Sequence, residues 1–308
     1  MNDVFPQISS SRELLVDPGM RVLVQGINGR TGRTHARLMR RYGTQIVAGV
    51  SRSGGSVEGI PVYATCAEAV AATGAVASVA MVSPLAVAAA VEEAVAAGIN
   101  LVVTVAEGMP VADAVRTLKR VKAAGARWIG ASTPGIAIPG RLKLGFLPDV
   151  ALAPGHLGVM SKSGTLSYEV CYRLVSRGLG QSLWVGVGGD PVKGTRFRDL
   201  LPVFAADPNT TAVVVIGEIG GSEEEELAAA IVGSGFRKPV YALVAGRTAR
   251  EGLTMGHAGA LVHGATGTFE SKRAALTAAG VRVFARIQDL VDAVASAPAS
   301  SNGDASCS

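Results

Sequence analysis

The chain has 308 residues, of which 48% are hydrophobic and 17% are charged. This balance is typical of a compact protein with a large buried core, and the length suits two ordinary domains. The net charge of +5 comes from scattered basic residues, without a Lys/Arg block or interleaved aromatic residues, and this distribution argues against nucleic-acid binding.

Short apolar runs alternate with helical patterns, which predicts parallel sheets covered by helices. In the first half we expect strands at residues 20–25, 45–50, 77–82, 100–105 and 127–129, and helices at 31–41, 66–72, 84–97 and 111–124. In the second half we expect strands at 157–160, 182–187, 212–216, 240–244 and 281–284, and helices at 165–177, 197–205, 223–232, 268–279 and 287–294.

Two doubly wound α/β domains are the simplest interpretation of this order. We expect a Rossmann-like domain over residues 18–145 and a flavodoxin-like domain over 146–294, because a Pro/Gly-rich stretch at 134–154 interrupts the pattern. Residues 1–17 are interpreted as an N-terminal extension and 295–308 as a disordered polar tail.

The cellular compartment is predicted from the cysteines and the N-terminus. Cys66, Cys171 and Cys307 show no CxxC spacing, which is typical of reduced thiols in a cytosolic protein. The N-terminus lacks the apolar core of a signal peptide, and Pro84 and Gly98 interrupt the most apolar stretch. We therefore expect a cytoplasmic protein without a membrane span, and the sequence shows no metal-binding motif.

The first predicted strand leads into a glycine-rich turn, GINGRTG at residues 26–32, and then into a helix. Glycines at this spacing allow N–H groups at the helix start to approach a phosphate, although an ordinary tight turn is an alternative. Ser51, Arg52 and Ser53 follow the second strand, where an NAD site would carry an acidic residue. The turn therefore favours CoA or NADP over NAD.

A second anion site is predicted at Ser161-Lys162-Ser163-Gly164-Thr165, between a strand and a helix. Backbone N–H groups and the helix dipole would form it, and simple capping by serine is the alternative. Glycine clusters follow two later strands, and Glu218 lies within the second cluster, GEIGG. Ligands of open α/β sheets bind at the carboxyl ends of strands, so Glu218 is a candidate site residue.

His257 lies in a glycine-rich stretch, GHAGA, after the strand at 240–244. A neutral imidazole nitrogen can accept a phosphoryl group, and a carboxylate such as Glu218 on the other nitrogen would fix the tautomer. Beside an anion-binding helix start, His257 is predicted to be catalytic.

These segments together resemble the alpha subunit of succinate–CoA ligase over residues 18–294. The shared blocks are QGINGRTGRTH, YGTQIVAGV, EGMPV, SKSGTLSYE, GVGGDPVKG, VVVIGEIGGSEEEE and MGHAGA. The resemblance implies a ligase that forms acyl-CoA from a carboxylic acid, CoA and ATP or GTP. It implies that an ATP-grasp beta subunit, which holds the nucleotide with Mg, phosphorylates His257. Phospho-His257 would then form an acyl phosphate, which the CoA sulfur attacks.

The resemblance also implies contacts for each ligand. CoA would be bound by Asn28, Gly29, Arg30, Thr31 and Arg52 and, further along, by Val105, Ala106 and Glu107. The phosphohistidine would be held by Ser161, Ser163 and Gly164. Glu218 would orient His257, and Tyr168 would lie near the carboxylate substrate.

Some blocks depart from the family pattern. The usual PGKGG loop is shortened to SRSGG at residues 51–55, so Arg52 must replace a lysine or CoA affinity falls. The usual SRSGT is SKSGT, and the usual GPNCPG is GASTPG at residues 130–135. Because the surroundings of CoA and of the acyl group differ, we hypothesise that succinate is not the preferred acid. A malate–CoA or citrate-cleaving relative is the alternative within this class.

Two other functions remain open on the residues alone. An NADP-dependent oxidoreductase would fit the first turn and Arg52, but it leaves GEIGG and GHAGA unexplained. A non-catalytic CoA-binding or regulatory module would fit the altered CoA loop, and it would bind CoA without forming phosphohistidine.

Overall fold

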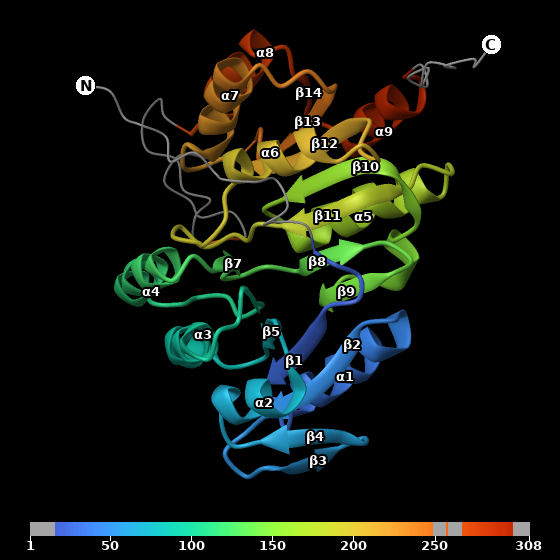
Figure 1. Cartoon of the computed structure of the whole chain (residues 1–308). Helices are drawn as coiled ribbons and strands as arrows, with labels where there is room; N and C mark the ends of the chain where they lie inside the picture. The colour runs from blue at the N-terminus through green and yellow to red at the C-terminus, as the bar shows by residue number, and fades with distance from the viewer. Residues whose placement is uncertain (1–15, 249–256, 258–266, 298–308) are drawn as a thin grey trace, which may run out of the picture.

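A computed structural model describes residues 16–248, 257 and 267–297 of the chain. Within these residues the strands form two seven-stranded sheets, and helices cover both faces of each (Figure 1). The arrangement confirms the predicted doubly wound α/β class. Most of the predicted N-terminal extension and of the predicted C-terminal tail lies outside the described residues.

The first sheet has the strand order β3-β4-β2-β1-β5-β6-β7. Its strands are β1 (Arg21–Gln25), β2 (Gln45–Val50), β3 (Gly55–Val57), β4 (Ile60–Tyr63), β5 (Ala77–Ala80), β6 (Leu101–Thr104) and β7 (Arg127–Ile129). All neighbours pair in parallel except β3 and β4, which form an antiparallel pair at the edge. The sequence pattern missed this edge pair because its strands are too short to show a clear alternation.

Helices cover both faces of the first sheet. On one face lies α1 (Arg30–Tyr42), and on the other lie α2 (Cys66–Thr73), α3 (Val87–Ala96, preceded by a 3-10 turn at Pro84–Ala86) and α4 (Val111–Ala123). Leu23 of β1 belongs to the cluster under α2, α3 and α4, whereas its neighbour Val24 packs in the cluster that contains Met39 of α1. Side chains alternate across a strand, so both sides of β1 are buried.

The second sheet has the strand order β14-β13-β12-β10-β11-β8-β9. Its strands are β8 (Gly135–Ile138), β9 (Leu142–Gly145), β10 (Pro154–Ser161), β11 (Gln181–Gly186), β12 (Ala212–Glu218), β13 (Val240–Ala245) and β14 (Arg282–Phe284). One face carries α5 (Gly164–Val175) and α9 (Ile287–Ala295), and the other carries α6 (Phe197–Ala206), α7 (Glu223–Ser234) and α8 (Phe269–Ala278). A 3-10 turn at Asp149–Ala151 precedes β10.

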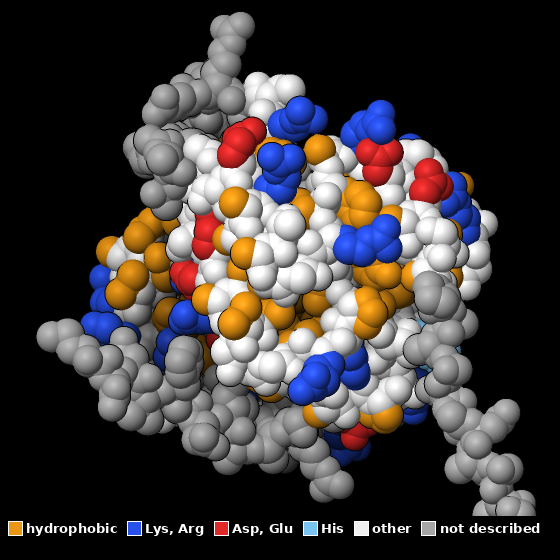
Figure 2. All heavy atoms as spheres, turned by 90° about the horizontal axis from the view of Figure 1, so that it is seen from above, with side chains coloured by type: hydrophobic (Ala, Val, Ile, Leu, Met, Phe, Trp, Pro, Cys, Tyr) orange, Lys and Arg blue, Asp and Glu red, His pale blue; other side chains and the backbone are white. Residues whose placement is uncertain are grey.

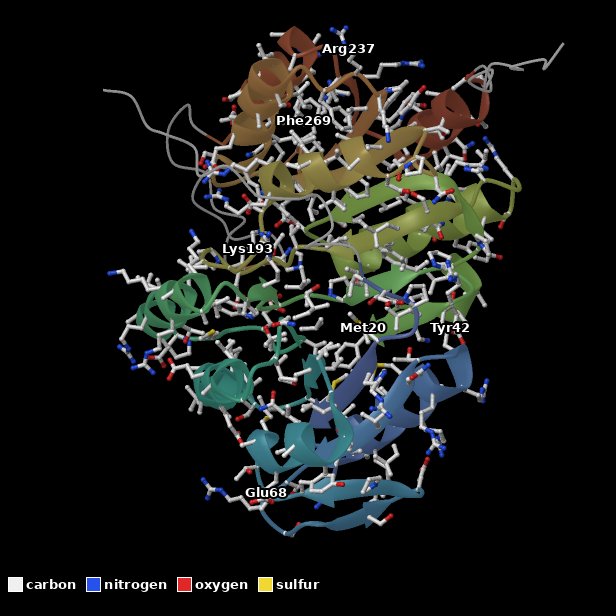
Figure 3. The ribbon with its side chains drawn as sticks, in the orientation of Figure 1. Met20, Tyr42, Glu68, Lys193, Arg237 and Phe269 are labelled. Atoms are coloured by element: carbon white, nitrogen blue, oxygen red, sulfur yellow. The ribbon has the colours of Figure 1, made fainter. Side chains whose placement is uncertain are left out.

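The predicted Pro/Gly-rich linker contains the hairpin β8–β9. This hairpin pairs antiparallel with β11, so residues 135–145 are part of the second sheet, whereas the predicted division at 145 assigns them to the first domain. The hairpin also contacts the first domain, because the Thr44 hydroxyl donates to the Lys143 carbonyl at 2.7 Å and accepts from the Lys143 N–H at 3.1 Å. Tyr42 lies at the same junction (Figure 3).

Each sheet has one point at which the order of added strands reverses. The point lies between β1 and β5 in the first sheet and between β10 and β12 in the second. Ligands of doubly wound sheets bind at the carboxyl ends of the strands beside such a point. The glycine-rich turn follows β1 and the Ser161–Gly164 loop follows β10, so both predicted anion sites lie where the topology favours a ligand.

The face of the molecule seen in Figure 2 carries Lys and Arg side chains at separate places, interspersed with apolar and uncharged groups. A nucleic-acid interface would gather these side chains into one patch. In the part of the chain that the structure describes, no helix has the length and apolar character needed to cross a membrane.

We expect Thr44→Val to destabilise the chain at the contact between hairpin and first domain. Thr44 is 3% exposed, and valine keeps its shape but loses both hydrogen bonds to Lys143. The free energy of unfolding should fall by about 1–3 kcal/mol, measured by urea denaturation. Thr73→Val is the control, because that hydroxyl bonds only to Ala69 within its own helix, and its cost should stay below about 0.5 kcal/mol. Equal unfolding midpoints for the two variants would contradict the prediction.

Candidate active site

The site is centred on a hydrogen bond between Glu218 and His257. Glu218 is the last residue of β12, and its carboxylate oxygens lie 2.8 and 3.1 Å from Nδ1 of His257. In the neutral ring, Nδ1–H donates to the carboxylate. Nε2 then carries no proton and keeps its lone pair. Such a nitrogen can act as a nucleophile toward a phosphoryl group. The remainder of the GHAGA stretch lies outside the described residues.

The surroundings of His257 favour its protonated form. The hydrogen bond that His257 donates to Glu218 raises the pKa of His257, and burial opposes this shift. The Glu107 carboxylate raises the same pKa further, while the Lys193 ammonium lowers it. Glu107 belongs to the loop after β6, so groups from both domains act on one imidazole.

Gly189 provides the surface against which the His257 ring packs. A β-carbon added at Gly189 would lie 2.5 Å from Cγ of His257, which is far inside a normal contact distance. A side chain at this position would therefore displace the ring. The sequence shows Gly189 as one member of a glycine cluster after β11, but the ring contact depends on how the chain folds.

The Ser161–Gly164 loop joins β10 to α5. The Ser161 hydroxyl donates to the Ser163 carbonyl at 2.7 Å and accepts from the Ser163 N–H at 3.1 Å. The Ser163 side chain caps α5 by accepting from the Leu166 N–H at 3.3 Å. The capping alternative is therefore realised. The first N–H groups of a helix, here at Gly164 and Thr165, are also groups that can bind an anion.

Asp190 connects the two domains beside the histidine. Its carboxylate accepts from the backbone N–H groups of Gly108 and Met109, both at 3.3 Å. Burial raises the pKa of Asp190, and the two N–H groups oppose this shift. The contact ties the loop that carries Val105, Ala106 and Glu107 to the chain after β11. No sequence pattern indicates a role for Asp190, since only the fold brings residues 108 and 190 together.

The turn after β1 brings the predicted CoA-phosphate residues together. The Asn28 side-chain amide donates to the hydroxyls of Ser51 and Ser53, at 2.9 and 2.7 Å. Helix α1 begins after Gly29 with no side-chain cap and no acidic residue in its first turn. Asn28, Gly29, Arg30, Thr31 and Arg52 are all exposed. An uncapped helix start beside two arginines can bind a phosphate group.

Tyr168 lies on α5 next to the Ser161–Gly164 loop. Its ring packs edge-on against Trp184, with centroids 5.8 Å apart, and burial raises the pKa of its hydroxyl. The hydroxyl is 3.4 Å from where a β-carbon on Gly164 would lie. The half-buried Tyr168 is therefore within reach of a ligand at the start of α5.

The segment that departs from the family pattern, residues 130–135, runs between the two sheets. The Thr133 hydroxyl donates to the Gly186 carbonyl, and the Thr133 side chain is buried. The Ser132 N–H donates to the Ala106 carbonyl at 2.8 Å. Thr133 thus holds the end of β11, whereas Ser132 is only partly buried.

Outside this site, the described residues form a hollow on the second domain. A hollow of about 370 Å³ between α6 and the end of α7 is lined by Leu201, Pro202, Ala205 and residues 234–238. It contains none of the predicted site residues, and Arg237 marks its position in Figure 3. Among the residues that the structure describes, no three His, Cys, Asp or Glu side chains are grouped so that they could hold a metal ion.

Comparison with known proteins relates both halves of the chain to CoA-dependent ligases. Residues 19–108 match the family described as CoA binding domain, and residues 160–282 match the CoA-ligase family. The chain is 46% identical to succinate–CoA ligase [ADP-forming] subunit alpha 1 of Archaeoglobus fulgidus, over 91% of this chain and 97% of that one. It is 42% identical to the ADP-forming sulfoacetate-CoA ligase subunit SauD of Bilophila wadsworthia, over 89% of this chain and 95% of that one.

Solved structures share the fold at lower sequence identity. ATP citrate lyase from Methanothrix soehngenii, in complex with citrate and coenzyme A, is similar with a TM-score of 0.81 and 23% identity over 92% of this chain. Dinucleotide-forming acetyl-coenzyme A synthetase 1 of Ca. Korarchaeum cryptofilum has a TM-score of 0.72 and 20% identity over 89% of this chain. The chain spans 50% and 60% of these two chains, so the likeness concerns the fold of one part of each.

We expect Glu218→Gln to lower the pKa of His257, because the amide cannot supply the negative charge that stabilises the imidazolium. In the wild type this pKa should lie above 6.5, so the pair stabilises the folded chain fully below pH 6.5. The stabilisation is lost as pH rises through the folded-state pKa. NMR titration of the imidazole C–H signals measures the shift, and exposed His156 in the same spectra is the internal control. An unchanged His257 titration in the variant would refute the assigned cause.

Proposed function

This chain belongs to the family of succinate–CoA ligase alpha subunits, and we propose that it is the CoA-binding, histidine-phosphorylated subunit of an acid–CoA ligase. The observation that carries the proposal is the Glu218–His257 hydrogen bond at the end of β12, the strand that pairs with β10, and β10 leads into α5. The proposed nucleophile His257 and the carboxylate that orients it therefore lie at the point where the strand order of the second sheet reverses. The proposed anion-binding helix start follows β10 at the same point.

The proposed reaction begins at Nε2 of His257. This nitrogen attacks the terminal phosphorus of the nucleotide, the bond to the nucleoside diphosphate breaks, and a phosphoryl–nitrogen bond forms. Glu218 accepts the Nδ1–H hydrogen bond and supports the positive charge that develops on the ring. The N–H groups at Gly164 and Thr165 would stabilise the phosphoryl oxygens, as a helix start does for phosphates.

The phosphoryl group then moves from His257 to the carboxylate of the acid. An acid oxygen attacks phosphorus and His257 leaves with its lone pair restored. The CoA thiol sulfur attacks the resulting acyl carbon and the bond from that carbon to the phosphate oxygen breaks. The departing phosphate takes up the thiol proton, and the acyl-CoA thioester remains. Tyr168 is proposed to contact the acid, because its hydroxyl lies at the start of α5, next to the proposed phosphoryl site.

CoA is proposed to bind along the carboxyl ends of the strands of the first sheet, toward His257. Asn28, Gly29, Arg30, Thr31 and Arg52 would hold its phosphates, since they surround the uncapped start of α1. Val105, Ala106 and Glu107 would contact CoA nearer the histidine, because Asp190 ties their loop to the second domain. We also propose that the CoA-binding domain ends near residue 134, before the hairpin that joins the second sheet.

The partner is proposed to be a beta subunit with an ATP-grasp domain. The sheets and helices of the described residues are taken up by the two doubly wound units, and the A. fulgidus relative that carries the name subunit alpha has nearly the same length. That partner would bind ATP or GTP with Mg and deliver the phosphoryl group to His257.

The acid is proposed to be a small molecule with a carboxylate and a second anionic group. Succinate and sulfoacetate, which appear in the names of two relatives, are acids of this kind. The hypothesis that succinate is not the preferred acid rests on residues 130–135. Because Thr133 is buried against Gly186, Ser132 is the changed residue with access to a ligand.

The direct test is acid-labile phosphate on the chain. We expect the assembled enzyme to incorporate label from γ-labelled ATP or GTP, and His257→Asn to incorporate none, because asparagine offers no nucleophilic ring nitrogen. CoA plus a panel of acids should discharge the label, with an acid other than succinate discharging it fastest. A clear succinate preference would refute the acid hypothesis. A wild type that takes no label from a competent partner would leave the non-catalytic CoA-binding module as the function.

Gly189→Ala tests the position of the ring. The new β-carbon would lie 2.5 Å from Cγ of His257, so the ring must shift, and we expect phosphorylation to slow by about 10- to 100-fold. Gly233→Ala is the matched control, because a β-carbon there in helix α7 meets nothing within 4 Å. Equal phosphorylation rates of the two variants in single-turnover assays would exclude the ring contact as a constraint.

A further inference from the structure

A cluster of buried charges includes Glu218 of the Glu218–His257 pair. It consists of Lys162, Lys193, Lys272, Glu218, Glu223 and Glu224, all of which are less than 9% exposed. Buried ion pairs are costly to desolvate, and apolar residues of similar volume often stabilise a core as well. The location of the cluster, between the phosphate loop and the histidine, therefore needs a reason other than stability.

Lys162 belongs to the Ser161–Gly164 loop, but its ammonium group lies in the interior. Lys162 Nζ is 2.8 Å from Oε1 and 3.0 Å from Oε2 of Glu224, the second residue of α7. Its backbone N–H donates to the Ile216 carbonyl of β12 at 3.0 Å. The Lys162 charge is therefore neutralised by Glu224, and it connects the loop to α7 rather than serving as a free phosphate ligand.

Glu224 contacts the other half of the site with the same carboxylate. Its Oε1 accepts from the backbone N–H of Glu218 at 3.1 Å, and Lys272 of α8 donates to Oε2. A β-carbon at Gly217 would lie 2.5 Å from Glu224 Oε1, so the carboxylate packs directly on the strand end. Burial alone would raise the pKa of Glu224, but the Lys162 and Lys272 ammonium groups lower it to about 2. Glu224 is thus an anion throughout the working pH range.

We propose that Lys162 and Glu224 are positioning residues, whose ion pair sets the distance between the phosphate-binding helix start and the Glu218–His257 pair. The proposal rests on the proposed function. One carboxylate touches both the Lys162 side chain of the loop and the backbone of the residue that orients the nucleophile. Phosphoryl transfer requires Nε2 and the N–H groups of α5 to be in register, and a shift of about 1 Å costs about 100-fold in rate.

The test compares Lys162→Met with Lys272→Met in the assembled enzyme. Each removes one ammonium group from Glu224, but only Lys162→Met releases the loop. We expect Lys162→Met to slow single-turnover phosphorylation of His257 by about 100-fold. Lys272→Met should lower the melting temperature and leave the phosphorylation rate near that of the wild type. Lys162→Arg, which keeps a cation at this place, should recover most of the rate.

A double variant separates positioning from folding, because Lys162→Met alone leaves the buried Glu224 carboxylate with one ammonium partner, Lys272, instead of two. Lys162→Met/Glu224→Met removes both charges and should regain melting temperature. Its phosphorylation should stay slow, since methionine cannot accept the Glu218 N–H. A rate that recovers together with the melting temperature would overturn the proposal, as would equal rate losses in Lys162→Met and Lys272→Met. A wild type that takes no label would instead overturn the proposed function.

Discussion

A histidine that carries a phosphoryl group must have one ring nitrogen bound and the other free. The Glu218 carboxylate meets the first requirement, because it occupies Nδ1 and leaves Nε2 to react. This hydrogen bond depends on the end of β12, where Glu218 is held in a nearly buried position. Gly189, in the segment after β11, completes the arrangement, because the absence of its side chain makes room for the ring.

Charge beneath the site is organised by the start of α7. Four consecutive glutamates, Glu223 to Glu226, occupy its first turn, where the helix dipole favours negative charge. They neutralise Lys162, Lys193 and Lys272 in the interior and Arg196 nearer the surface. The buried lysines are therefore paired with glutamates. In the proposed reaction the first N–H groups of α5 would bind the phosphoryl group.

The two domains are held together by contacts that also serve the site. Asp190 accepts hydrogen bonds from the loop after β6, and Thr133 donates one to the end of β11. Away from these residues, Thr44 of the first domain is hydrogen-bonded to Lys143 in β9 of the hairpin. One hydrophobic cluster runs through both domains, from Val24 of β1 through Leu144 of the hairpin to Val215 of β12. The two halves of the chain thus share one hydrophobic cluster in the described residues.

The sequence by itself determined the α/β class, most helix and strand positions and the motif residues, because hydrophobic periodicity and glycine-rich turns are local properties. It also singled out Glu218 and His257 as candidates. Only the tertiary structure decided that these two meet, that the hairpin at 135–145 joins the second sheet and that the Lys162 ammonium lies in the interior. These facts depend on strand order and packing, which bring distant residues together, and no local pattern in the chain records that proximity.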